Sequence, residues 1–390
     1  MEDSNKEEER SAAEDFRRHL QQRLPAGPAD RSKEDVLRWV DESVDLLTEI
    51  SSISWGPETS DSTLVDRLRE ELEGIPLINP RDEPFTHAIM KTLCEEVETA
   101  CGALGIPLHS GVAYGSSPTL DVDAARYAVH FTDASVITLS AGFISFCSHI
   151  SKMFSLSLLH EPQGKMFSVC FKPSRVFAKI GSDPALKYYW TEIIGAYAFG
   201  SGPLIVKQQL VPSPASITRV HLLRAMELFS VAHEYAHHIG RHGKRDITGV
   251  GEDPIGKREE YEADLFALAL SRHIGTNEQP QNLYAMSGAG AVLLLKCLEC
   301  VRAARQILRT GKETTQSSRT HPNASDRIAA FDTLDAPLPK SEKEIFKQIR
   351  ADFAAVTDAV WAKLSPWYVE MYNHGLRPDE DSSVDSWLFN

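Results

Sequence analysis

The sequence predicts an α+β fold that is mostly helical and carries a small antiparallel sheet, with helical additions at both ends. Three observations favour it. Long segments such as 217–230 and 257–270 run without glycine or proline and contain apolar stretches, which is typical of helices. Residues of high β-propensity gather in two short runs, at 126–131 and 136–139. The 390 residues show no internal repeat, so we expect one large domain with additions, or two domains.

The N-terminal third divides into two parts. Residues 1–30 are acidic and end in Pro25-Ala-Gly-Pro28, which predicts a disordered or loosely helical tail. Residues 31–110 are predicted to form a helical N-terminal region. Its first helix opens at Ser32 and carries an apolar stripe that we interpret as a core face (Val36, Val40, Val44 and Leu47).

The rest of the chain divides into a central domain, residues 111–335, and a C-terminal helical extension, residues 336–390. In the central domain the two β-rich runs flank the turn-like tetrad 132–135, which predicts a hairpin. The extension opens with Ser341 and Glu344, the spacing of a helix capping box.

The most informative motif is His233-Glu234-Tyr235-Ala236-His237. On a helix, residues four apart lie one above the other, so both imidazoles can reach one ion. Glu234 lies about 100° further round and is free to act on water. The motif therefore indicates a zinc hydrolase in which Glu234 is the general base. Gly240 follows closely and predicts that this helix ends or bends there.

A catalytic zinc usually takes three protein ligands, so a third must come from elsewhere. His238 would face away from His233 on an unbroken helix, and its ordinary interpretation is a packing residue. His242 falls one position short of the third histidine of the metzincin pattern, where this chain has Gly243. The helix predicted over 257–270 offers Glu260, although its acidic residues also fit a solvated face.

Three blocks in order resemble the gluzincin metallopeptidases of the prenyl-protein protease and heat-shock membrane protease type. They are His233-Glu-x-x-His237, Glu260-x-x-Ala263-Asp264 and His321-Pro322-x-x-x-x-Arg327. The soluble Lit-type phage-exclusion peptidases are similar too. The resemblance covers about residues 125–335 and implies a zincin-like metallopeptidase domain over residues 111–335.

The resemblance also implies roles for individual residues. His233, His237 and Glu260 would bind Zn²⁺, and Glu234 would be the catalytic base. Asp264 would support a ligand imidazole from the second shell of residues. His321 would lie near the metal and assist catalysis, although a histidine beside a proline also fits an ordinary helix start. Tyr261 and Arg327 are further candidates for stabilising the charge that develops on the substrate.

These residues predict a zinc-dependent endopeptidase that cleaves a protein or peptide substrate by a zinc-activated water. The Lit-type resemblance suggests a regulatory or phage-defence protease. The alternative is a metal-binding regulatory pseudopeptidase that acts by binding a partner. An intact Glu234 favours the enzyme, because a structural zinc site needs no base.

Charge and composition limit the partners. A formal net charge of −14 argues against non-specific nucleic-acid binding, which depends on lysine and arginine. The chain shows no secretory signal and no membrane span, so we expect a cytoplasmic protein. Six cysteines without a disulfide pattern fit a reducing compartment, and the pair Cys297 and Cys300 is interpreted as core packing.

Overall fold

The structure of the protein is a computed structural model. It describes residues 2–23, 31–55, 63–75, 81–108, 111–164, 166–200, 202–207, 209–242, 254–313 and 322–378.

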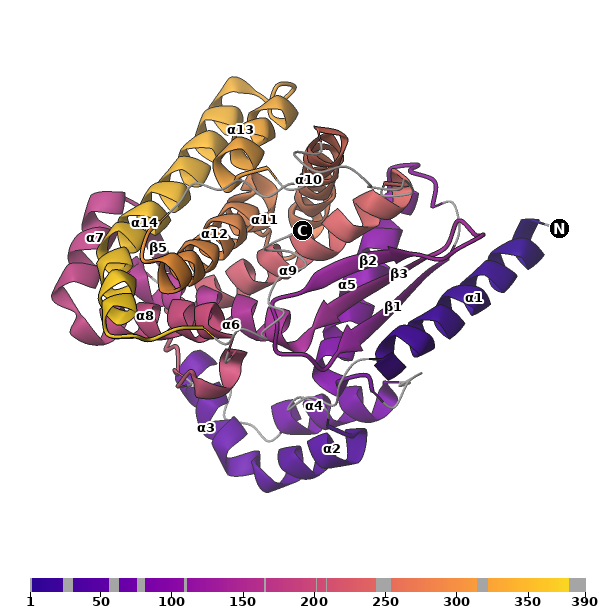
Figure 1. The fold of residues 1–390 in the computed structure, drawn as a ribbon, viewed down its shortest axis with the longest axis horizontal. Coiled ribbons are helices and arrows are strands. Elements are labelled where there is room, and N and C mark those ends of the chain that lie inside the picture. The colour runs from indigo at the N-terminus through magenta and orange to yellow at the C-terminus, as the bar shows by residue number, and fades with distance from the viewer. Residues whose placement is uncertain are drawn as a thin grey trace.

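Most of the described chain is helical, as the sequence predicts, with few strands (Figure 1). The helices are α1 (Glu2–Arg23), α2 (Lys33–Glu42), α3 (Val44–Trp55), α4 (Thr63–Gly74), α5 (Pro84–Ala103), α6 (Ala141–Ser157), α7 (Pro173–Ser182), α8 (Pro184–Phe199), α9 (Ala215–Ile239), α10 (Pro254–Asn277), α11 (Leu283–Ser287), α12 (Ala289–Thr310), α13 (Ala324–Leu334) and α14 (Lys340–Asn373). A 3₁₀ helix spans Gly202–Ile205. The strands are β1 (Val112–Ser117), β2 (Ala124–Ala128), β3 (Ser135–Ser140), β4 (Leu159–Gln163) and β5 (Met166–Cys170).

The main sheet has three strands in the order β1-β3-β2. Strands β2 and β3 pair antiparallel, which confirms the predicted hairpin, although β2 begins and ends earlier than the run 126–131. The prediction of a wholly antiparallel sheet is wrong, because β1 pairs with β3 in parallel, with Val112 opposite Ser135. The sequence of β1 has no clear apolar alternation and contains Gly115, so the strand gave no pattern to recognise. Strands β4 and β5 form a separate antiparallel pair.

The two faces of the main sheet pack against different helices. Side chains alternate along a strand, so Ile137 and Leu139 of β3 enter the main core. Helices α5 and α9 cover that face. Val136, the residue before Ile137, packs with Ala113 of β1 against α1 on the other face. The sheet therefore lies between α1 and the helix that carries the zinc motif (Figure 1).

Within the segment predicted to be a disordered or loosely helical tail, residues 2–23 form the helix α1, which packs against the sheet. Ala13, Phe16 and Leu20 lie on one side of α1 and pack against the sheet. The guanidinium of Arg17 is fully buried, 3.1 Å from a carboxylate oxygen of Asp82. The acidic composition conceals this apolar side, because apolar residues are few in the sequence of α1.

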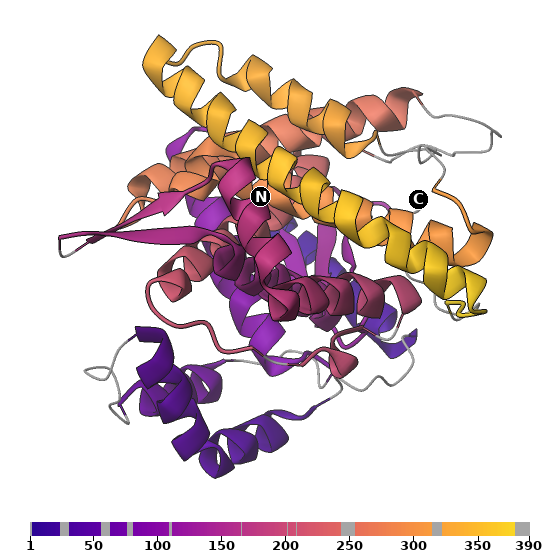
Figure 2. The ribbon, with the colours of Figure 1, turned by 90° about the vertical axis from the view of Figure 1, so that its left-hand side faces the viewer.

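The other helices form a small lobe and a large body. Helices α2, α3 and α4 lie together below the body in both views and enclose a small core of their own, which includes Val36 and Val40 (Figures 1 and 2). Of the stripe predicted as a core face, Val36 and Val40 are buried, whereas Val44 and Leu47 lie in α3 and are half-buried. Helix α14 crosses the body (Figure 2), and its Phe353 and Val360 belong to the same core as α9.

No helix in the described ranges has the length and apolar character needed to cross a membrane.

Candidate metal centre

Helix α9 presents the two histidines of the zinc motif on one side. It is buried for most of its length, as its apolar upstream half predicts. The helix ends at Ile239, where the N–H of Gly240 bonds to the carbonyl of Ala236 at 2.8 Å. The predicted end at Gly240 is confirmed. His233 and His237 lie one turn apart, with ring centroids 4.7 Å from each other.

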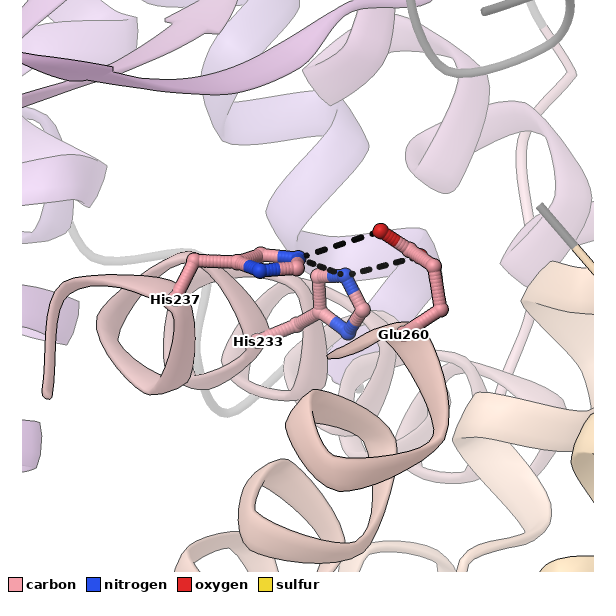
Figure 3. A group of neighbouring side chains, drawn as sticks. All are labelled: His233, His237 and Glu260. Atoms are coloured by element: carbon pink, nitrogen blue, oxygen red, sulfur yellow. Dashed lines mark hydrogen bonds and ion pairs between the residues drawn. The ribbon is translucent and has the colours of Figure 1, made fainter. Parts of the chain in front are cut away.

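Helix α10 packs against α9 and supplies the third side chain. Ala263, Ala267, Leu268 and Leu270 of α10 are fully buried, so this helix is held by its apolar side. Glu260 lies near its start and points at the two imidazoles (Figure 3). Its side chain is only 9 % exposed, and it is not part of a solvated acidic face.

The three ligand atoms lie at the separations that a tetrahedral ion requires. The Nε2 atoms of His233 and His237 are 3.0 Å apart. The carboxylate of Glu260 lies 3.4 Å from Nε2 of His233 and 3.3 Å from Nε2 of His237 (Figure 3). Two ligands bound to zinc at its usual distance, in tetrahedral geometry, are about 3.3 Å apart. The spacing of the trio therefore fits one metal ion.

Two imidazoles and one carboxylate form the ligand set of many catalytic zinc sites, which keep a fourth position for water. His233, His237 and Glu260 offer one ligand atom each, all within 4.8 Å of one another. Across the described ranges, no other group of His, Cys, Asp and Glu side chains meets that condition.

Behind His233, Asp264 takes the supporting position that the resemblance implies. Its Oδ1 atom lies 3.1 Å from Nδ1 of His233, on the side of the ring away from Glu260. Arg327 of α13 donates from Nε and Nη2 to the two oxygens of Asp264, each at 2.6 Å. Burial would raise the pKa of Asp264, but the Arg327 guanidinium outweighs burial and holds that pKa below its ordinary value.

The electrostatics of the centre favour a cation. Burial would lower the pKa of His233, but the carboxylates of Asp264 and Glu260 raise it to about 10. In the metal-free protein this imidazole is therefore protonated on both nitrogens and positively charged at neutral pH. A metal ion bound at Nε2 would take the place of that positive charge.

The base candidate Glu234 is buried beside His233, with 4 % of its surface exposed. The charge of Glu234 interacts electrostatically with side chains at the edge of the sheet. Burial, then Glu234 and Asp121, raise the pKa of the Asp123 carboxyl to about 7. Arg126 on β2 and Arg327 on α13 also lie within electrostatic reach of Glu234.

The structure separates the remaining histidines. His238 is buried, with Nδ1 2.9 Å from the hydroxyl of Ser135 on β3, which supports its interpretation as a packing residue. His242 does not belong to the ligand trio, and its Nδ1 atom lies 3.0 Å from Nδ1 of His237 instead. His321, predicted to assist catalysis, lies outside the described residues.

The other candidates for stabilising substrate charge are constrained. Arg327 already binds Asp264 with both arms of its guanidinium. Burial, followed by the charges of Asp326 and Asp264, raises the pKa of the Tyr261 phenol.

Cys297 and Cys300 are free, buried thiols of α12, in agreement with core packing.

Comparison with known proteins adds no family: no family model, no curated protein and no solved structure matches this chain.

Sequence reasoning missed three residues at this centre. From the sequence, Arg126 is predicted only as part of a strand and His242 is considered only as an alternative metal ligand. No role is predicted for Asp123. One signal was available for His242, since Gly240 two residues earlier leaves room for a side chain to fold back onto the helix. Nothing in the sequence around Asp123 marks it.

Proposed function

We propose that the protein is a zinc-dependent endopeptidase of gluzincin type that hydrolyses a peptide bond of a protein or peptide substrate. The observation that carries this proposal is the convergence of His233, His237 and Glu260 at mutual distances of 3.0–3.4 Å. A buried acid, Glu234, follows the first of these ligands directly in the sequence.

The ligand set selects the ion and its chemistry. Two neutral imidazoles and a carboxylate suit zinc, whereas magnesium and calcium prefer oxygen ligands alone. Bound there, zinc would supply a Lewis acid that polarises the scissile carbonyl and makes water acidic near neutral pH.

The protein's own groups then perform the proton transfers. Glu234 accepts the proton that the attacking water loses, and it returns a proton to the nitrogen of the leaving amine. Asp264 keeps the His233 ring in place, and Arg327 keeps Asp264 ionised. The low exposure of Glu234 excludes bulk water from this carboxylate.

Strand β2 offers a position for an extended substrate. It is an edge strand of the main sheet and contacts α9, whose histidines form the centre. An extended peptide can pair with an edge strand through main-chain hydrogen bonds, which grip it with little regard to its side chains. This placement favours a peptide over a compact small molecule as substrate.

The test is a cleavage assay on the full chain. Protein stripped of metal is incubated with a mixture of unfolded proteins and peptides, with and without added zinc, and the products are identified by mass spectrometry. We expect new peptide termini only with zinc, and their loss on adding a chelator. Zinc binding without cleavage of any substrate would contradict the endopeptidase and favour a metal-binding regulator.

A further inference from the structure

We propose that His242 is a positioning residue for the metal centre: it holds the ring of His237 in the one tautomer and orientation that direct its Nε2 at the ion. This inference rests on the metal centre of the proposed function. It concerns how the second ligand histidine is held, because Asp264 serves only the first.

The contact joins a ring nitrogen of His242 to the nitrogen of His237 that does not face His233 and Glu260. Nδ1 of His242 lies 3.0 Å from Nδ1 of His237. On its far side, Nε2 of His242 lies 3.4 Å from a carboxylate oxygen of Glu262 on α10. The side chain of His242 is only 10 % exposed, so protein groups surround most of the imidazole.

The positions of the protons follow from the ligand geometry. Nε2 of His237 faces His233 and Glu260, and a ligand nitrogen must present a lone pair to the ion. The proton of the neutral His237 ring therefore sits on Nδ1 and is donated to Nδ1 of His242. His242 then carries its own proton on Nε2, facing Glu262. In this series of contacts, from His237 through His242 to Glu262, each N–H therefore faces an acceptor.

The local backbone is built to fold His242 back onto α9. A Cβ atom at Gly240 would come within 2.7 Å of the His242 ring, so only glycine leaves space for it. The next residue, Arg241, has a φ of 52°, a left-handed conformation that non-glycine residues seldom adopt. Such strain persists where surrounding contacts fix the backbone, often beside a functional site.

The sheet supplies those contacts. Arg126 of β2 donates from Nη1 to the carbonyl oxygen of His242 at 2.7 Å, and from Nε to the Ser135 hydroxyl at 2.9 Å. Arg241 pairs with Asp133, in the turn between β2 and β3, at 2.9 Å. The hairpin therefore holds the segment 241–242 at two points. Strand β2, the proposed substrate edge, is in this way connected to a metal ligand.

Two substitutions of similar shape to each other separate the effect of the hydrogen bond to His237 from the effect of packing at position 242. In His242→Asn the amide oxygen can occupy the place of Nδ1 and accept from His237, whereas His242→Leu has a similar shape and no acceptor. Zinc affinity is measured by competition with a chromophoric chelator, and the site geometry by the visible spectrum of the cobalt-substituted protein. We expect His242→Leu to bind zinc about 10–100-fold more weakly and to change the cobalt spectrum. His242→Asn should keep most of the affinity and the wild-type spectrum.

Gly240→Ala provides a second variant that leaves His242 itself unchanged. The added methyl group should displace the imidazole and weaken zinc binding as His242→Leu does. Gly102→Ala is the control, because Gly102 lies near the end of α5 and a Cβ there meets nothing within 4 Å. Circular dichroism checks that each variant is folded.

The outcomes distinguish this inference from the proposals on which it rests. Equal zinc affinity and equal spectra for His242→Leu and His242→Asn would overturn the positioning role alone. A wild-type protein that binds no zinc would overturn the metal centre and the positioning role together. Zinc binding without peptide cleavage would count against the endopeptidase and leave the role of His242 standing.

Discussion

Arg327 binds both carboxylate oxygens of Asp264, with two donor–acceptor distances of 2.6 Å, and so joins α13 to α10 directly behind a ligand histidine. Both side chains are almost completely buried, at 6 % and 0 % exposure. Breaking a buried ion pair is far more costly than breaking one in water, because the remaining charge stays in a medium of low polarity. The pair therefore affects both the stability of the fold and the state of the metal centre.

Replacing Arg327 by methionine should lower the free energy of unfolding by about 3–5 kcal/mol, since Asp264 loses its bidentate partner. The matched control is Arg38→Met, because Arg38 pairs with Asp35 on the surface, with the two side chains 65 % and 51 % exposed. We expect at most about 1 kcal/mol there. Urea denaturation monitored by circular dichroism measures both values. Equal losses in the two variants would contradict the importance of burial.

Glu234→Gln should bind zinc as the wild type does and lose about 10²–10⁴-fold in turnover, because an amide cannot accept the proton of water. Turnover is measured on whichever peptide the cleavage assay identifies, and bound zinc by atomic absorption. Glu370→Gln on α14 is the control, as its carboxylate is 69 % exposed and takes no part in the centre. Normal turnover in Glu234→Gln would show that another residue is the base.

Glu260→Ala should lose zinc, because only His233 and His237 would remain as described ligands. The neighbouring Glu259→Ala has the same change of charge on the same helix and should retain the metal. Metal content after dialysis against buffer decides between them. Stoichiometric zinc in Glu260→Ala would mean that another group completes the site.

Zinc affinity should increase with pH. In the metal-free protein the carboxylates of Asp264 and Glu260 raise the pKa of His233 to about 10, so zinc must displace a proton from this ring at neutral pH. This displacement predicts an affinity that rises by about tenfold per pH unit below pH 10 and then levels off. Calorimetry in buffers of different ionisation enthalpy counts the protons released. With the ordinary pKa of 6.5 for His233, this release would be nearly absent at about pH 8.

Arg17→Met should loosen α1 from the sheet. Arg17 is fully buried and pairs with Asp82, which is equally buried, so its loss leaves a carboxylate without its cation. The neighbouring Arg18→Met is the control, because Arg18 is 51 % exposed. Limited proteolysis should cut within α1 of Arg17→Met much faster than in Arg18→Met or the wild type. Equal rates of cleavage would show that the apolar contacts of Ala13 and Phe16 suffice.

The sequence predicts the three candidate ligands better than the residues around them. His233, His237 and Glu260 were recognised because a metal restricts residue types and spacing, and helical periodicity alone puts the two histidines on one side. Arg126 and His242 interact across 116 residues of chain, so no local pattern could connect them. Their contact depends on tertiary packing of the hairpin against the end of α9.

The same distinction applies to the fold. Long helices such as α9 and α10 were predicted because their apolar residues repeat over many turns. Strand β1 is not predicted because it pairs with β3 in parallel, a long-range contact, and its residues show no apolar alternation. A packed helix α1 is not predicted because its four apolar side chains at the sheet weigh little in a composition dominated by charge (Ala12, Ala13, Phe16 and Leu20).

The contacts of α1 also bear on aggregation. Arg17 donates to the carbonyl of Tyr114 at 2.7 Å, and Gln21 donates to the carbonyl of Ser116 at 2.6 Å, so one helix supplies β1 with the partners that another strand would offer. Exposed edges of sheets recruit strands from other molecules, and proteins commonly protect them. Because two carbonyls of β1 already accept hydrogen bonds from α1, this edge of the sheet is less open to strands of other molecules.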